Sequence, residues 1–136
     1  MLFVDTFTVP AGTLEASPIS RELLVQHGII HLVEVAFLDG PENEVHVILR
    51  RGIHRFVPSH PDGSIVGNAE AVPVSLFHPI EESPYFVTIE AWSPSATYDH
   101  EITVRIHILL REELQPPRPE LGVIQRLGKL IFGAGG

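Results

Sequence analysis

The sequence predicts an all-β fold: a single two-sheet antiparallel sandwich of about eight strands, jelly-roll or immunoglobulin-like in connectivity, followed by a C-terminal amphipathic helical arm. Three observations predict it. Apolar and polar residues alternate in short blocks, many of the 11 glycines and 12 prolines lie between these blocks, and no block before the C-terminal segment has helical spacing. With 136 residues, 44% of them hydrophobic and 19% charged, the chain has the size of one domain and can bury about two thirds of the surface of its unfolded form.

The clearest strand is expected at 101–110, where the even-numbered positions from Ile102 to Leu110 are all aliphatic and would face one way. The block at 85–92 alternates in the same manner. Because the segment between them, 93–97, is rich in turn formers, these two strands are predicted to be antiparallel neighbours. Further strands are expected at 3–9, 19–26, 29–38, 44–51, 53–57 and 71–77, and the last suits an edge because it carries Pro73.

The strand expected at 29–38 is mostly apolar on both faces. Alternation places His31, Val33, Val35 and Phe37 on one face and Ile30, Leu32, Glu34, Ala36 and Leu38 on the other. Since a strand of a free-standing sandwich normally shows one polar face to water, this strand either lies centrally beneath a loop or contacts another chain. The second alternative makes Ile30 and Leu32 candidate partner-binding residues.

The composition and the charge of the chain change near residue 115. A stiff proline-rich linker at 115–119 separates a sandwich domain at 1–114 from an arm at 115–136, in which an amphipathic helix is expected at 120–132. Residues 1–115 hold 6 arginines and 16 acidic side chains, a formal charge of −10, while 116–136 hold 3 basic residues and 1 acidic residue, a charge of +2. The apolar stripe of the expected helix supplies four more candidate partner-binding residues, Leu121, Ile124, Leu127 and Ile131.

Three alternatives remain open for this arm. The helix could cover an open end of its own sandwich, or it could dock its stripe on a neighbouring copy or another protein. A membrane-surface role is less favoured, because a helix with one apolar stripe and only two basic residues would bind a membrane surface weakly.

Composition and motifs disfavour several functions. The chain has no cysteine, which excludes disulfides and thiolate chemistry, and its net charge of −8 disfavours nucleic-acid binding. No apolar run approaches the roughly 18 residues of a membrane span, and the first residues lack the pattern of a secretion signal. Since no catalytic serine elbow, phosphate loop or dinucleotide motif is present, we expect no enzymatic activity and no cofactor.

Two groups of residues suggest ligands. The chain has eight histidines, but none forms an H-x-H pair or an H-E-x-x-H motif, so no metal site is expected. Trp92 ends a strand just before a loop, and Tyr98 follows within that loop. An aromatic pair in such a place could stack on a sugar, so the alternative function is a carbohydrate- or ligand-binding module; a structural cap on the core is the simpler interpretation of Trp92.

Three tracts carry a resemblance to known proteins: FVPSHPDGS at 56–64, PYFVTIEAW at 84–92 and TYDHEITVR at 97–105. They are similar to a family of small β-sandwich proteins of tailed phages, prophages and environmental viral sequences, over about residues 9–110. The resemblance implies a structural protein of the virion, either a capsid decoration protein or a small head or tail component, made in the host cytoplasm. It implies contacts with a major capsid or other virion protein, and the apolar strand faces predict a homo-oligomer.

Overall fold

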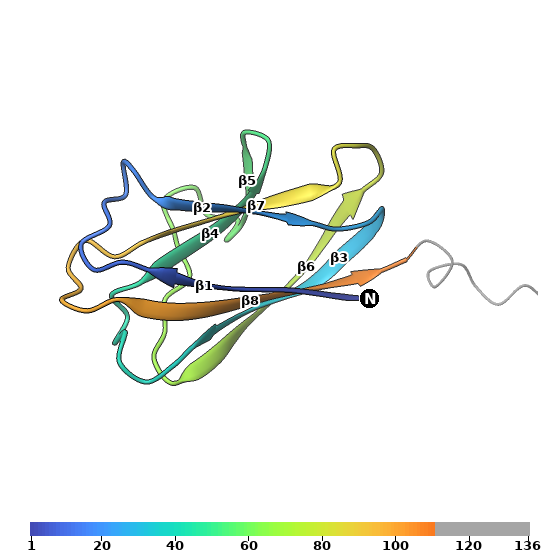
Figure 1. Ribbon diagram of the computed structural model, residues 1–136. Coiled ribbons are helices and arrows are strands. Elements are labelled where there is room, and N and C mark those ends of the chain that lie inside the picture. The colour runs from blue at the N-terminus through green and yellow to red at the C-terminus, as the bar shows by residue number, and fades with distance from the viewer. Residues whose placement is uncertain (111–136) are drawn as a thin grey trace, which may run out of the picture.

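The computed structural model describes residues 1–110 and arranges them as two four-stranded antiparallel sheets that pack face to face (Figure 1). Sheet 1 has the strand order β1-β8-β3-β6, and sheet 2 has the order β2-β7-β4-β5. The strands are β1 (Leu2–Val9), β2 (Ile19–Leu24), β3 (Gly28–Phe37), β4 (His46–Arg51), β5 (His54–Val57), β6 (Glu70–Ile80), β7 (Phe86–Trp92) and β8 (His100–Leu109). The two-layer all-β architecture predicted from the alternation is confirmed.

All eight predicted strands are present, but one predicted pairing is wrong. The strands at 86–92 and 100–109 do not pair with each other, because β7 belongs to sheet 2 and β8 to sheet 1. The turn-rich segment between them therefore crosses from one layer to the other. The edge position predicted for the strand that carries Pro73 is confirmed, since β6 ends sheet 1.

The strand pairing joins the first half of the chain to the second half in reverse order. Four antiparallel pairs, β1 with β8, β2 with β7, β3 with β6 and β4 with β5, run through the two sheets. Two further pairs complete the sheets: β3 with β8 joins the β1–β8 and β3–β6 pairs in sheet 1, and β4 with β7 joins the β2–β7 and β4–β5 pairs in sheet 2. Successive strands therefore alternate between the layers, apart from the β4–β5 hairpin, and Figure 1 shows β1 and β8 side by side.

The core lies between the two sheets and is aliphatic. Val33, Val104 and Ile106 from sheet 1 and Leu49 and Ile89 from sheet 2 are completely buried. Burying each such side chain contributes about 1.5–3 kcal/mol relative to leaving it in water. These residues are the inward half of the alternating pattern, so the pattern that predicted the strands also forms the core.

A bulge in β3 changes which side chains face outward. On the β8 side, Ile30 and Leu32 pair with the consecutive residues Ile108 and His107, so His31 is an extra residue in the ladder. The extra residue shifts the alternation by one. Ile30 consequently points inward and is 0% exposed. The prediction that Ile30 shares the outward face of Leu32 is wrong for this reason.

The C-terminal expectations lie outside the described residues. The linker and helix expected at 115–132, and the domain boundary expected after residue 114, fall beyond residue 110. Among residues 1–110, no helix is long and apolar enough to cross a membrane.

Candidate partner-binding surface

The outer face of sheet 1 is built by the outward half of four alternating strands. Strand register places Leu2, His107, Leu32 and Ser75 in one row across the sheet and Val4, Arg105, Glu34 and Pro73 in the next row. A third row contains Thr6, Thr103, Ala36 and Ala71, and one end of the face carries Ile29, His31, Phe77, Pro79 and Leu109.

Apolar side chains on this face are open to solvent. Phe77 is 73% exposed, Leu2 is 50% exposed and Val4 is 47% exposed, while Leu32 is half-buried between the neighbouring strands. A single exposed aliphatic residue is ordinary on a protein surface, but several on one sheet face form a patch of the kind that marks interaction sites.

The middle of the same face carries charges of both signs. Glu34 Oε1 lies 2.9 Å from His107 Nε2, and Arg105 lies directly opposite Glu34 in the pairing of β3 with β8. The ring of His31 contacts His107 edge to face, with 6.0 Å between ring centroids. The centre of the face therefore holds one carboxylate and one guanidinium in cross-strand register, and carries no excess negative charge.

The outer face of sheet 2 is organised differently. Arg50 donates a hydrogen bond to Glu90 at 3.0 Å, and Arg55 donates to the carbonyl oxygens of Pro61 and Gly63 in the segment that follows β5. Ile48 points outward from β4 but is only 2% exposed. The chain therefore covers the middle of this face with its own side chains and loop. Leu24, at the end of the edge strand β2, is 74% exposed, and it is the one large aliphatic side chain that the described part of the chain leaves open on the strands of this face.

The sheet edges carry features that oppose pairing with a further strand. On β1 and β2, the inward-pointing Asp5 and Arg21 form an ion pair at 3.0 Å. On β6, Pro73 and Pro79 lack the amide hydrogens that a ladder requires. β5 has only four residues. Charges that point inward, prolines and short strands are the devices by which sandwiches prevent edge-to-edge association, so the open surface is a face and not an edge.

The sequence-predicted partner-binding residues are divided by the structure. Leu32 lies on the outer face of sheet 1. Ile30 lies in the core, and the four residues of the predicted arm, Leu121, Ile124, Leu127 and Ile131, lie outside the described residues. Sequence reasoning missed Leu2, Val4 and Phe77. Each occupies an outward position of an alternating strand, so the alternation of apolar and polar residues could have identified it.

The aromatic pair suggested as a ligand platform is not brought together. Trp92 is 6% exposed, and the ring of His46 lies flat on it, with 5.6 Å between centroids and 7° between planes. His46 is held in turn by Ser64 Oγ at 2.8 Å from its Nδ1. Tyr98 is 74% exposed and does not line the hollow of about 460 Å³ beside Trp92.

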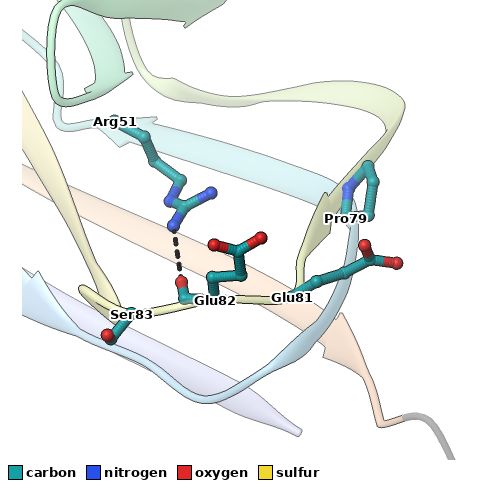
Figure 2. A pocket seen from close by; sticks show the side chains of 5 residues that line it. All are labelled: Arg51, Pro79, Glu81, Glu82 and Ser83. Atoms are coloured by element: carbon teal, nitrogen blue, oxygen red, sulfur yellow. Dashed lines mark hydrogen bonds between the residues drawn. The ribbon is translucent and has the colours of Figure 1, made fainter.

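A second hollow lies where the β4–β5 hairpin approaches the β6–β7 connection (Figure 2). It has a volume of about 340 Å³ and is lined by Arg51, Pro79, Glu81, Glu82 and Ser83. Arg51 donates hydrogen bonds to the backbone carbonyls of Glu82 and Pro84 at 3.1 and 3.0 Å. The Arg51 guanidinium therefore holds the β6–β7 connection against the β4–β5 hairpin, which is a structural role.

His78 closes the neighbouring edge of the sandwich. Its ring stacks on Phe56, with 4.2 Å between centroids, and beside His54 at 6.1 Å. Burial, together with the charge of Arg51 and the proximity of His54, lowers the pKa of His78 below its usual 6.5. The imidazole is thus held neutral as a packing group. Within residues 1–110, no three histidine or acidic side chains converge to hold a metal ion.

Comparison with solved structures shows what this fold is similar to. A chain of the cyanophage Pam1 capsid asymmetric unit matches with a TM-score of 0.53 and 15% identity, over 78% of this chain and 81% of that chain. The crystal structure of FLHE matches at 14% identity over 78% and 94% of the two chains, with a TM-score of 0.38, which is too low to support an argument. No family model and no curated protein matches the sequence. The sandwich is therefore a fold shared with a chain of a phage capsid.

Proposed function

We propose that this chain is a non-enzymatic structural protein of a viral particle, either a capsid decoration protein or a minor head or tail component. It works through contacts with copies of itself and with a major capsid or other virion protein, and the virion is its location. The observation that carries the proposal is the outer face of sheet 1, where exposed apolar side chains on the two edge strands lie on either side of the Glu34–His107 pair of the central strands. Such a face is costly on a solitary protein and useful in an assembly.

The fold supports the same proposal. Within the sandwich, we assign the jelly roll and not the immunoglobulin-like connectivity, since the pairing of β1 with β8, β2 with β7, β3 with β6 and β4 with β5 is that of a long ribbon rolled into two sheets. The likeness to a phage capsid chain extends over nearly equal shares of both chains, so the two are of similar length. Because a fold alone does not define function, the proposal rests on the outer face of sheet 1.

The ligand-binding alternative receives no comparable support. A sugar-stacking platform needs an aromatic face open to solvent. Trp92 is buried beneath His46, and the exposed Tyr98 does not line the hollow beside Trp92, so these two rings do not form a shared platform.

The test is association with particles. Density-gradient fractions of particles released by the host that carries this gene are probed with an antibody against the purified chain. We expect the chain to band with filled particles, and a Leu32→Asp variant to fold but to be lost from that band. Glu22→Arg, an exposed charge change on sheet 2, serves as the control and should be retained. Recovery of the wild-type chain only in the unassembled fraction would overturn the proposal.

A further inference from the structure

We propose that the outer face of sheet 1 binds the same face of a second copy of this chain, around a two-fold axis that runs between β8 and β3 nearly parallel to the strands. The inference deepens the proposed function and rests on it, because it specifies how copies of a structural subunit contact one another. The occupant of the face follows from three properties of the described residues: the charge of the face, its register and its size.

The charge of the face suits a second copy. The chain carries a formal charge of −8, so two copies repel each other through most of their surfaces. On the outer face of sheet 1, Glu34 Oε1 lies 2.9 Å from His107 Nε2, and Arg105 is the cross-strand partner of Glu34 in the register of β3 and β8. The outward positions of β3 and β8 hold two carboxylates, Glu34 and Glu101, and one guanidinium, Arg105. This face can therefore approach an acidic molecule of the same kind with less like-charge repulsion than the rest of the surface.

The register makes the face complementary to itself. Arg105 and Glu34 lie directly opposite each other on the two central strands, with Val4 and Pro73 at the two ends of the same row. Rotation by a half turn about an axis between β8 and β3 exchanges these positions between the copies. Arg105 of one copy then lies over Glu34 of the second copy, and Val4 lies over Pro73. An axis perpendicular to the strands would instead bring Arg105 onto Arg105, which like-charge repulsion disfavours.

The dimensions agree with a stable interface. Four strands spaced about 4.8 Å apart and about 30 Å long give a plan area on the order of 600 Å². The accessible area of a face corrugated by side chains is larger than its plan, which brings it near the roughly 800 Å² per partner of a standard interface. Packing of two sheets about 10 Å apart with a small rotation is an ordinary arrangement for β proteins.

The experiment uses charge reversal in the full chain and measures self-association by sedimentation. We expect the wild-type chain to be dimeric at about 100 μM. Arg105→Glu alone places two carboxylates opposite each other at both symmetric positions, and Glu34→Arg alone places two guanidiniums there. Each variant should weaken dimerisation at least about tenfold. A mixture of the two variants restores both opposite-charge contacts, and only the mixture should form a dimer of near wild-type affinity.

Controls separate folding from association. Circular dichroism should show the same β spectrum for each variant, and Glu22→Arg, which alters the net charge by the same amount as Glu34→Arg on the other sheet, should leave the dimer unchanged. A wild-type chain that is monomeric at about 100 μM, or a mixture no more associated than its components, would overturn the inference.

One outcome would assign the face to another occupant. If the full chain is monomeric and Ile124→Glu alters the NMR signals of Leu32 and Phe77, the face is covered by the chain's own C-terminal segment, and the dimer is wrong. The particle experiment distinguishes the two proposals. A dimer that is absent from particles refutes the proposed function alone, and a monomer that is present in particles refutes the dimer alone.

Discussion

The two outer faces of the sandwich differ although both are made by alternating strands. On sheet 2, Arg50 binds Glu90, and the outward Ile48 is buried under the chain's own groups. On sheet 1, Val4 and Phe77 remain open to solvent. A face completed within the chain contributes to the stability of the monomer, whereas a face left open contributes only when something binds it. Substitutions on the outer face of sheet 2 should therefore mainly change the stability of the monomer, and substitutions on the outer face of sheet 1 should mainly change association.

The largest expected effect concerns the aliphatic residues of the two faces. Ile48→Ala should lower the free energy of unfolding by about 2–4 kcal/mol, because it leaves a cavity at a buried site. Leu32→Ala should cost less than about 1 kcal/mol, since Leu32 is only half-buried. Urea unfolding at low protein concentration measures both without a contribution from association. If the two variants lose the same free energy of unfolding, the proposed difference between the two faces is wrong.

A pH-dependent effect is expected at the edge between β5 and β6. The lowered pKa of His78 means that the unfolded chain binds a proton more readily than the folded chain. Its contribution to stability is therefore fully present above pH 6.5 and is lost as the pH falls through the lowered folded value. His78→Phe should flatten this part of the curve of unfolding free energy against pH. His27→Phe is the control, because His27 is exposed and its ring meets Tyr85 only edge to face at 6.5 Å. Equal flattening by both variants would contradict the assignment.

A smaller effect should separate the arginines of the two faces. Arg50→Ala removes the partner of the half-buried Glu90 and should cost about 1 kcal/mol of unfolding free energy. Arg105→Ala should cost less than about 0.5 kcal/mol in the monomer but should weaken self-association. Thermal unfolding and sedimentation of the same samples measure the two quantities. The contrast fails if Arg105→Ala destabilises the monomer as much as Arg50→Ala does.

The smallest effect on stability is expected at the edge between β1 and β2. Asp5→Asn breaks an ion pair whose arginine is 46% exposed, so it should cost less than about 1 kcal/mol. Because the inward charge also discourages edge pairing, the variant should aggregate more on prolonged incubation, which light scattering measures. Thr8→Asn, an exposed change on the same strand, should show neither effect.

Part of the candidate surface could be predicted from the sequence. Alternation placed Leu32 on an apolar strand face, because that property depends on local spacing, and Pro73 indicated an edge strand because proline lacks the amide hydrogen that a ladder requires. The position of Ile30 could not be predicted, because the bulge at His31 arises from the ladders with β6 and β8. The pairing of Arg105 with Glu34 was hidden for the same reason, as these residues lie 71 positions apart in the sequence.

By itself, the sequence determined the strands, their inward sides and the all-β class, because a strand's alternation is a property of neighbouring residues. Only the tertiary structure decided which strands share a sheet, as the separation of β7 from β8 shows. It also decided which outer face the chain covers. Both outward sets contain apolar residues, and whether they become core or open surface depends on loops and side chains that arrive from distant parts of the chain.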